Sequence, residues 1–262
     1  MKLAIAGYGY VGRAYAAILQ NYHETQLIDP KHFHGKKISP DVDAVIICVA
    51  TPVGLKGACN MIHVKEVIQD CPDVPILIKS TISLEGWEYL QSRFNNKNIS
   101  FSPEFLRAAY ALEDLRQQEY IMIGGKQTDF WVNLFKKIFP SCPHIIEADP
   151  KELVLIKYFR NAYLATKISF FNQVFDFCKA AGIDFEHVRK GIVLDKRIGA
   201  SHSKVTEERG FGGHCLPKDA YALKHSALYY GVDLSLIKLI LEYNGNLLDK
   251  NFRDETDEDK EN

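Results

Sequence analysis

The stretch KLAIAGYGYVG, residues 2–12, decides the fold. It begins with a short apolar run, continues through three glycines, and leads into the helical pattern RAYAAILQNY at 13–22. In a GxGxxG turn between a strand and a helix, the first glycine permits the tight turn, the second lets a pyrophosphate approach the backbone, and the third lets the helix pack on the strand. The N–H groups at the helix start attract the phosphates. The stretch therefore predicts a dinucleotide-binding unit built on Gly7, Gly9 and Gly12, and a glycine turn without a ligand is the alternative.

An acidic residue ends the next predicted strand, TQLID at 25–29, close to the distance of about 20 residues at which dinucleotide-binding proteins hold the ribose. A carboxylate at Asp29 would accept hydrogen bonds from ribose hydroxyl groups and repel a 2′-phosphate, so it favours NAD over NADP. Lys31 and His32 weaken this preference, because positive charge nearby would attract the same phosphate. The sequence predicts NAD as the cofactor.

Strand and helix patterns alternate in the first half of the chain and give way to helices in the second. Apolar runs typical of buried strands lie at 2–6, 25–29, 43–50, 74–80, 98–103, 119–125 and 144–148, with helical patterns at 60–70, 84–94 and 127–139. Later helical patterns lie at 151–182, 184–193, 217–230 and 233–250. Such an order is typical of a parallel sheet with helices on both faces, followed by a helical domain. We therefore predict an α/β fold with a Rossmann-like, doubly wound parallel sheet at 1–149, an all-helical domain at 150–250 and a disordered acidic tail at 251–262.

The overall composition is that of an ordinary globular protein. Hydrophobic residues make up 47% of the 262 residues, and 32 basic against 33 acidic side chains leave a net charge of -1. This balance argues against nucleic acid or an anionic membrane as a partner, and no apolar run approaches the roughly 18 residues of a membrane span. The six cysteines form neither a CxxC pair nor a His/Cys cluster at metal-ligand spacing. We expect reduced thiols, no metal site and a cytoplasmic location.

Two polar residues share one face of the long apolar helix predicted from residue 151. Lys157 and Asn161 are four residues apart, so their side chains point the same way. An ammonium and an amide directed into a cleft would hold an alkoxide or carbonyl oxygen while hydride leaves the adjacent carbon. Alternatively, Lys157 extends to the surface along its own methylene chain and Asn161 is a hydrogen-bonded amide of the core.

The stretch GFGGHCLPKD at 210–219 surrounds one cysteine with the features of a reactive thiol. Three glycines in four positions form a backbone that a ligand can approach closely, and Pro217 suits the first position of a helix. Cys215 would then lie near a helix N-terminus with Lys218 adding positive charge, and both features favour the thiolate form. They predict a nucleophile, and a buried structural thiol is the alternative.

Several of these stretches occur together, in the same order, in one enzyme family. They are GYGYVG (7–12), CVATP (48–52), KSTIS (79–83), SPEFLRAAYALED (102–114), KYFRNAYLATKISFFNQ (157–173), DKRIG (195–199) and GFGGHCLPKD (210–219). In this combination the chain resembles the UDP-glucose/GDP-mannose dehydrogenase family from its N-terminus to about residue 250, and most closely the members that oxidise UDP-glucose. The resemblance implies oxidation of the primary alcohol of a nucleotide-linked sugar to a carboxylate, UDP-glucose to UDP-glucuronate, with two NAD per turnover.

The resemblance also implies how the reaction proceeds. Cys215 would trap the aldehyde as a thiohemiacetal, which loses a second hydride to give a thioester that water hydrolyses. Lys157 and Asn161 would stabilise the developing oxyanion. Asp219 would orient water or Lys157.

Further positions of the matched motifs would contact water, cofactor and substrate. Glu104 would help to activate the hydrolytic water, and Thr81 would position water near the reacting carbon. The residues expected to contact NAD are Gly7, Tyr8, Gly9, Tyr10, Val11, Gly12, Asp29, Val49, Thr51, Pro52, Ser80, Thr81, Glu104 and Lys218. Those expected to contact the nucleotide sugar are Phe105, Leu106, Arg107, Lys157, Asn161, Arg197, Phe211, Gly212, Gly213 and Cys215. The structural alternatives are a helix-start carboxylate at Glu104, a strand-end cap at Thr81 and a first-turn acid at Asp219.

The chain departs from the family pattern in three places. Only 13 residues (30–42) lie between Asp29 and the next predicted strand, where the family inserts a longer segment, so we expect a more open adenosine end. Ser83 replaces the proline of the family's KSTVP-type turn, and His214 stands where a small residue is common; neither removes a reacting group. Family members continue into a second α/β domain that closes over the nucleotide, so we expect weaker binding of the uridine or guanosine end. The chain would then be a minimal enzyme, have a partner that completes the nucleotide pocket, or have lost activity.

Other functions stay open beside the leading one. The same chemistry could act on GDP-mannose or a UDP-N-acetyl sugar. A two-electron alcohol dehydrogenase of the β-hydroxyacid kind also presents Lys-x-x-x-Asn on a helix, but its cycle needs no cysteine, so Cys215 argues against it. A nucleotide-binding protein without catalysis is the candidate from another class. The oligomeric state is open, and the resemblance favours a homodimer formed through residues 233–250.

Overall fold

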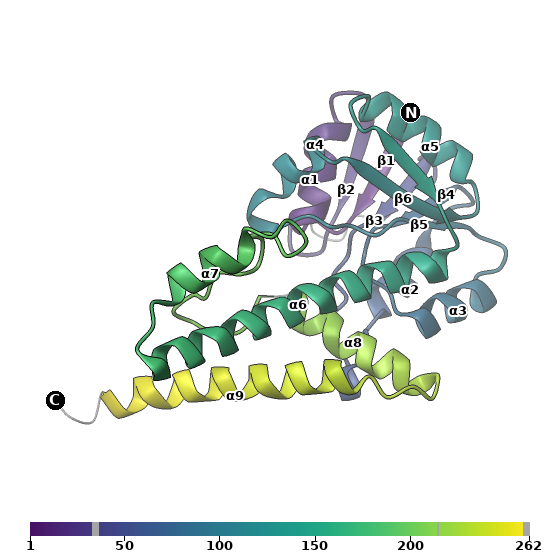
Figure 1. The fold of residues 1–262 in the computed structure, drawn as a ribbon. Coiled ribbons are helices and arrows are strands. Elements are labelled where there is room, and N and C mark those ends of the chain that lie inside the picture. Colours follow the sequence, from purple (N-terminus) through teal and green to yellow (C-terminus); the bar gives the residue numbers. More distant parts are fainter. Residues whose placement is uncertain (33–36, 214, 259–262) are drawn as a thin grey trace. The chain divides into compact units, whose positions relative to one another are not determined.

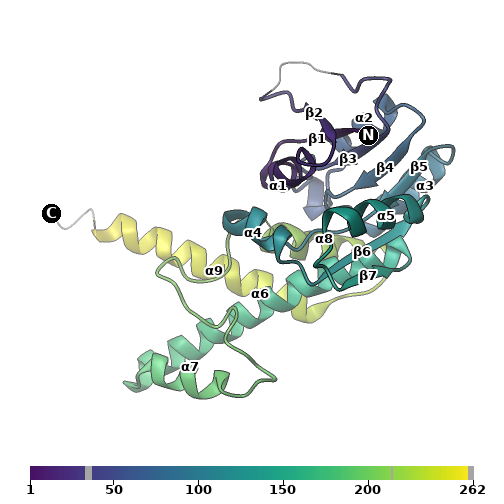
Figure 2. The same ribbon diagram turned by 90° about the horizontal axis from the view of Figure 1, so that it is seen from above.

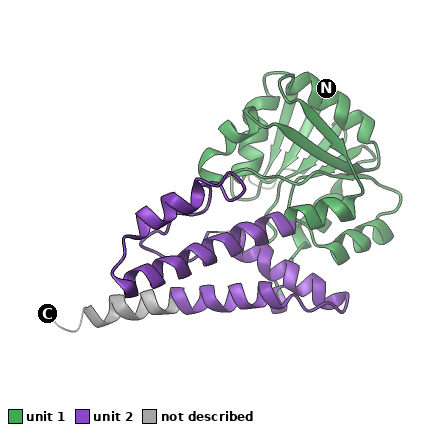
Figure 3. Cartoon of the chain, viewed as in Figure 1, with its two compact units in different colours: residues 1–54, 59–157 green, residues 55–58, 158–262 purple. Residues whose placement is uncertain are grey.

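A computed structural model describes residues 1–32, 37–213 and 215–258, and the chain divides into two compact units. Unit 1 comprises residues 1–54 and 59–157, and unit 2 comprises residues 55–58 and those from 158 onward (Figure 3). The long helix α6 (Pro150–Ala181) begins in unit 1 and continues in unit 2.

The predicted domain boundaries after residues 149 and 250 stay predictions. The first coincides with the start of α6, whereas the two units divide between residues 157 and 158, inside that helix. The second lies inside the last helix, α9 (Ser235–Glu258), which extends into the segment that we predicted as a disordered tail. Residues 259–262 of that segment lie outside the described residues.

Unit 1 contains a seven-stranded sheet, visible in Figures 1 and 2. The strands are β1 (Lys2–Ala6), β2 (Glu24–Ile28), β3 (Ala44–Ile47), β4 (Pro75–Ile78), β5 (Asn98–Phe101), β6 (Tyr120–Gly125) and β7 (His144–Glu147). They stand in the order β2-β1-β3-β4-β5-β6-β7. The first five pair in parallel, β6 is antiparallel to β5, and β7 is parallel to β6. The predicted doubly wound fold class is confirmed, but the expectation of a wholly parallel sheet is wrong at β6.

The reversal at β6 follows from the short connection that precedes it. Between β5 and β6 the chain forms the 3-10 turn η2 (Ala108–Tyr110) and the helix α4 (Ala111–Arg116), which has six residues. A helix of this length rises only about 9 Å. A parallel neighbour needs a crossover that carries the chain back along the sheet, whereas an antiparallel neighbour can start at the edge where β5 ends.

Helices cover both faces of the sheet because the chain leaves its centre in two directions. The connection from β1 leads to β2 on one side and that from β3 leads to β4 on the other, and right-handed crossovers then place their helices on opposite faces. One face carries α1 (Tyr10–Leu19), α4 and α5 (Thr128–Ile138), and the other carries α2 (Ile62–Asp70) and α3 (Leu84–Arg93) (Figure 2). Leu3 and Ile5 of β1 share an apolar cluster with Trp131 and Phe135 of α5, as the alternation of side chains along a strand requires.

Ser83, the residue that departs from the family's proline, has a clear structural role. It is the N-cap of α3, and its hydroxyl oxygen accepts a hydrogen bond from the backbone N–H of Gly86 at 3.1 Å. Such a cap satisfies one of the backbone donors that a helix start leaves without a partner. Ser83 therefore stabilises the start of α3 by a side-chain cap.

Unit 2 is helical, as predicted. Besides its part of α6 and α9 it contains α7 (Phe185–Val193), α8 (Leu216–Tyr229) and the 3-10 turn η1 (Leu55–Gly57) (Figure 1). Helix α8 packs against both η1 and α9. None of the helices in the described ranges is long and apolar enough to cross a membrane.

Candidate active site

The glycine turn after β1 has the backbone that dinucleotide binding requires. Gly7 has a φ of 95°, and a Cβ there would lie 2.6 Å from backbone atoms of Cys48 and Val49 at the end of β3. A Cβ on Gly12 would overlap the carbonyl oxygen of Gly7. By contrast, a Cβ on Gly9 would meet no described atom within 4 Å. The outer two glycines are therefore required by the fold, and the middle one leaves room for a phosphate.

The start of α1 is suited to an anion. Gly9 is the N-cap, no side chain caps this end, and the first turn contains no acidic residue. The first backbone N–H groups of the helix therefore keep their partial positive charge for a ligand. Tyr8, Tyr10 and Val11 are half-buried and pack at the edge of the apolar cluster of unit 1.

Asp29 follows β2 and holds the same turn in place. Its Oδ2 accepts the backbone N–H of Tyr8 at 2.8 Å, and its Oδ1 accepts that of Lys31 at 2.9 Å and lies 3.0 Å from Nδ1 of His32. Burial works to raise the pKa of Asp29, but these three partners together outweigh it and hold the pKa below its ordinary value. The carboxylate therefore stays charged, as the preference for NAD over NADP requires. Together with the space at Gly9, the residues present fit a dinucleotide.

The loops after β3 and β4 lie at the same edge of the sheet as the glycine turn. The Ser80 hydroxyl donates to the carbonyl oxygen of Val49 at 2.7 Å, which ties the two loops together. Thr51 is buried, Pro52 is exposed, and Thr81 is half-buried. Carboxyl ends of strands beside the point where the strand order reverses are the usual place for a ligand in such sheets.

Glu104 lies at the centre of a buried polar cluster that the sequence analysis missed. Its side chain is 9% exposed, and Oε1 lies 2.5 Å from Nζ of Lys79 and accepts the hydroxyl of Tyr15 at 2.6 Å. Burial, and then the negative charge of Glu104, raises the pKa of Tyr15 well above its ordinary value, so the phenol stays protonated and donates. The predicted contact of Glu104 with water stays a prediction, and the structure shows this carboxylate already bound by two donors.

The residues around Glu104 divide between the core and the surface. The Lys157 ammonium donates to the backbone carbonyl oxygen of Glu104 at 2.5 Å and lies 5.3 Å from the centre of the Phe105 ring. Leu106 packs against the apolar cluster. Arg107 is exposed, and its guanidinium forms an ion pair with Asp114, with Nη2 2.6 Å from Oδ1. Its expected contact with the sugar nucleotide would compete with that pair.

In unit 2, Asn161, Lys218 and Asp219 form a second polar cluster around the start of α8. Cys215 is the half-buried N-cap of α8, and its carbonyl oxygen accepts the N–H of Asp219 at 2.9 Å. The Asp219 carboxylate is 1% exposed; Oδ2 accepts an N–H of the Asn161 amide at 2.6 Å, and Oδ1 lies 2.5 Å from the ammonium of Lys218. Pro217 takes the second helical position, because α8 begins at Leu216 rather than at the proline. The structure therefore brings Asn161, Asp219 and Lys218 together, one turn beyond the cysteine.

The glycine loop before Cys215 is held from α9. The Phe211 N–H donates to Oδ1 of Asn244 at 2.6 Å, and the amide N–H of Asn244 donates back to the Phe211 carbonyl at 2.9 Å. Gly210 has a φ of 58°, and a Cβ there would overlap the same amide oxygen. Phe211 is itself buried, so the ring predicted to contact substrate belongs to the core, whereas Gly212 and Gly213 are exposed.

Two further positions named in the sequence analysis are Arg197 and His214. Arg197 is 89% exposed on its side chain and forms an ion pair with Asp195 across 2.5 Å. His214 lies outside the described residues. Among the residues that the structure does describe, no group of His, Cys, Asp and Glu side chains could hold a metal ion.

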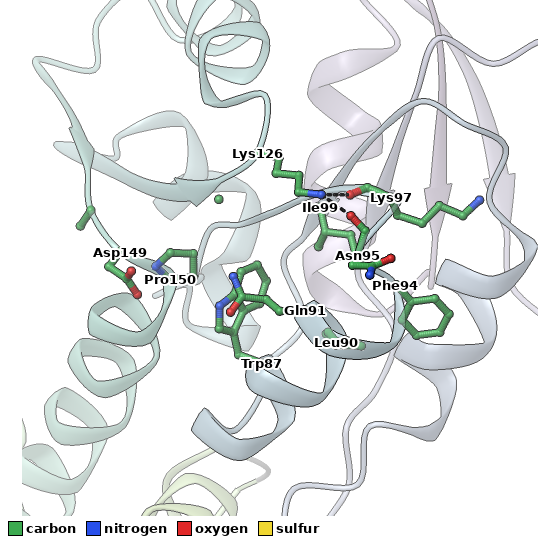
Figure 4. Close-up of a pocket in the computed structure, with 12 residues that line it drawn as sticks. Trp87, Leu90, Gln91, Phe94, Asn95, Lys97, Ile99, Lys126, Asp149 and Pro150 are labelled. Carbon is green, nitrogen blue, oxygen red and sulfur yellow. Dashed lines mark hydrogen bonds between the residues drawn. The ribbon is translucent and has the colours of Figure 1, made fainter.

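A cavity of about 480 Å³ lies elsewhere in unit 1 (Figure 4). Its walls come from α3, from the ends of β5 and β6, and from the start of α6, with Trp87, Leu90 and Phe94 on its apolar side. The Lys126 ammonium at its rim donates to the carbonyl oxygens of Asn95 and Lys97. None of the residues predicted for the active site lines this cavity.

The residues missed by the sequence analysis carried a signal nonetheless. Tyr15 and Asn244 occupy buried positions on apolar helix faces, and Lys79 ends the apolar strand run of β4. A polar side chain at a buried position must find a hydrogen-bond partner inside the protein. The pattern marks such residues as structural or functional, but it does not identify the partner.

Two models of one family match most of the chain. The NAD binding domain of the UDP-glucose/GDP-mannose dehydrogenase family matches residues 32–142, and the central domain of the same family matches residues 151–246. The first match begins after the glycine turn, so the assignment of that turn rests on its own geometry.

Individual relatives agree with the family match. The chain is 32% identical over 232 residues to a UDP-glucose 6-dehydrogenase of Rickettsia felis, covering 80% of this chain and 50% of the relative. It is 30% identical over 289 residues to the UDP-glucose 6-dehydrogenase of Campylobacter jejuni, covering 93% and 72%. A UDP-glucose dehydrogenase from the archaeon Pyrobaculum islandicum has the same fold, with a TM-score of 0.81 at 24% identity, over 94% of this chain and 68% of that one. The chain spans about half the length of several curated relatives it matches. The dinucleotide turn, the family motifs in order and these matches show that the chain belongs to the UDP-glucose/GDP-mannose dehydrogenase family.

Proposed function

We propose that the chain is an NAD-dependent dehydrogenase that oxidises the sugar 6-hydroxymethyl group of a nucleotide sugar to a carboxylate, with UDP-glucose as substrate and Cys215 as nucleophile. The observation that carries the proposal is the place of Cys215. It is the half-buried N-cap residue of α8, it follows a glycine loop with exposed positions, and it lies one turn before Asp219, whose buried carboxylate is bound to Asn161 and Lys218. The form of a cysteine that attacks an aldehyde is the thiolate.

The reaction requires two oxidations at one carbon. NAD, when bound, accepts a hydride from that carbon in each of them. Lys157 and Asn161 hold the substrate oxygen as the alcohol becomes a carbonyl. The Cys215 sulfur then adds to the aldehyde carbon, and the thiohemiacetal loses its hydride to become a thioester. Water cleaves the carbon–sulfur bond, so alcohol, water and two NAD⁺ give carboxylate, two NADH and three protons.

The cluster in unit 2 prepares Asn161 for this role. One N–H of its amide is bound to Asp219, which fixes the orientation of the group, and an amide has a second N–H to donate. The ammonium of Lys218 neutralises Asp219, so the buried carboxylate adds little repulsion to a developing oxyanion. We therefore assign Asp219 and Lys218 to the support of Asn161.

The stoichiometry of NADH tests the proposal. Purified protein with NAD and UDP-glucose should form about two NADH per sugar, and Cys215→Ala should abolish this yield. Cys215→Ser should stall at or before a covalent intermediate, whereas Cys142→Ser, at a half-buried thiol of unit 1, should keep full activity. GDP-mannose and a UDP-N-acetyl sugar serve as competing substrates. Undiminished uronate production by Cys215→Ser would refute the assignment, and NAD binding without NADH from any sugar nucleotide would support a binding protein.

The proposal includes a second copy of the chain as a partner. A second copy would pack along residues 233–250, where Leu236 and Leu239 of α9 are 58% and 61% exposed. Light scattering should give twice the chain mass, and Leu239→Lys should give a monomer.

A further inference from the structure

The buried cluster around Glu104 links segments that the sequence keeps far apart. Tyr15 lies on α1, the helix that begins at the dinucleotide turn, and Lys79 follows β4. Both bind the same carboxylate oxygen, the hydroxyl at 2.6 Å and the ammonium at 2.5 Å. One side chain of the loop after β5 therefore joins two other elements of unit 1.

The ammonium of Lys79 is fully engaged inside the unit. It donates to the Ser102 hydroxyl at 2.7 Å, and it lies 5.0 Å and 5.2 Å from the ring centres of Tyr15 and Phe135. Its side chain is 1% exposed. A buried ion pair of this kind commonly adds no more stability than well-packed apolar residues would, so stability alone does not explain it.

The main chain of Glu104 connects the cluster to the proposed active site. Its carbonyl oxygen accepts a hydrogen bond from the ammonium of Lys157 at 2.5 Å, and the neighbouring Phe105 ring lies 5.3 Å from the same ammonium. Tyr15 and Lys79 hold the side chain of Glu104, and the carbonyl oxygen of the same residue is an acceptor of the Lys157 ammonium. The direction of the Lys157 side chain then depends on the two residues that hold Glu104.

Both partners of the Glu104 side chain are buried donors, an ammonium and a phenol, and both bind the oxygen Oε1. We propose that Tyr15 and Lys79 are positioning residues that act through Glu104 to hold the Lys157 ammonium for the first oxidation. The inference rests on the proposed function, since it assigns these residues to that reaction.

The decisive variant is Tyr15→Phe, which removes one hydroxyl and keeps the buried ring. Tyr22→Phe is the matched control, because Tyr22 follows the same helix and is exposed. Brief acetylation followed by peptide mass spectrometry gives the labelling of Lys157 relative to Lys151, which lies on the same helix in an ion pair with Glu88. Tyr15→Phe should raise this ratio about threefold to tenfold, because a hydrogen bond to a charged group is worth about tenfold or more. Tyr22→Phe should leave it unchanged.

Turnover measurements separate an effect on the first oxidation from an effect on hydrolysis of the thioester. Tyr15→Phe should lower kcat about threefold to tenfold with KM values for NAD and UDP-glucose within about twofold, and no adduct should accumulate on Cys215 during turnover. An unchanged labelling ratio in Tyr15→Phe would overturn the inference. So would an adduct that accumulates on Cys215 in Tyr15→Phe, since hydrolysis rather than the first oxidation would then be the slowed step. The labelling ratio needs no turnover, so a chain that makes no NADH overturns the proposed function while the ratio still decides whether the cluster holds Lys157.

Discussion

Replacing Asn244 by alanine should destabilise unit 2 by about 2–5 kcal/mol. The amide of Asn244 binds both the N–H and the carbonyl oxygen of Phe211, at 2.6 Å and 2.9 Å, and both residues are buried. The substitution leaves two buried backbone groups without partners, and each costs roughly 1–3 kcal/mol. Alanine is the better helix former, which offsets up to about 0.7 kcal/mol of the lost free energy of unfolding.

Asn246 provides the matched control for this experiment. It lies on the same helix two residues later and is exposed, so Asn246→Ala makes the same change in helix propensity without touching the loop. Urea unfolding followed by circular dichroism is the suitable assay, because both tryptophans, Trp87 and Trp131, lie in unit 1 and their fluorescence would not report on unit 2.

Hydrogen exchange of the peptide that contains Phe211 should locate the effect. Its amide should exchange faster in Asn244→Ala and at the same rate in Asn246→Ala, because only the first variant removes the acceptor of that N–H. If the free energies of unfolding of the two variants lie within about 0.5 kcal/mol of each other, the two hydrogen bonds between Asn244 and Phe211 do not stabilise the loop, and the reasoning from buried hydrogen bonds fails.

Two other predictions concern the cofactor turn. Gly12→Ala should lower the free energy of unfolding by about 1–3 kcal/mol, because its Cβ would overlap the Gly7 carbonyl, whereas Gly9→Ala should leave stability unchanged and raise the Kd for NAD about tenfold in calorimetry. Equal effects of both variants on stability would contradict this division. The pKa of Asp29 is depressed in the folded chain, so its contribution to stability is present above its ordinary pKa near 3.9 and is lost as the pH falls through the folded value. Acid unfolding of Asp29→Asn between pH 6 and 2 should therefore be less steep, and an unaltered slope would refute the role of the charge.

Elements defined by local pattern were predictable from the sequence. All seven strands and the long helix from Pro150 were expected within a few residues of their bounds, because apolar runs and helical periodicity act over short distances. Helix α4 was not expected, since six residues give too little periodicity to recognise. The direction of β6 depends on that short helix, so it was missed for the same reason.

Pairings between distant side chains were not predictable in the same way. Glu104 was selected as a catalytic residue from its motif, but its partner Tyr15 is 89 residues away in sequence. The periodic pattern of the sequence shows that a polar residue lies on the apolar face of a helix. Only the fold shows which group is its hydrogen-bond partner. Asn161, Asp219 and Lys218 were each selected, yet the hydrogen bond that joins Asn161 to Asp219 spans 58 residues.

Glycine in these motifs has two different causes, packing against the chain's own atoms and space for a ligand. A side chain at Gly7, Gly12 or Gly210 would collide with the chain's own atoms, so packing is enough to require glycine there. No described atom lies within 4 Å of a Cβ built on Gly9, Gly212 or Gly213. Glycine at these three positions keeps space open beside the start of α1 and before Cys215, where a dinucleotide phosphate and a sugar would have to approach the backbone. Substitutions at Gly9 and Gly212 should therefore reduce binding without reducing stability, whereas Gly213 has a φ of 73° and a side chain there would also strain the backbone.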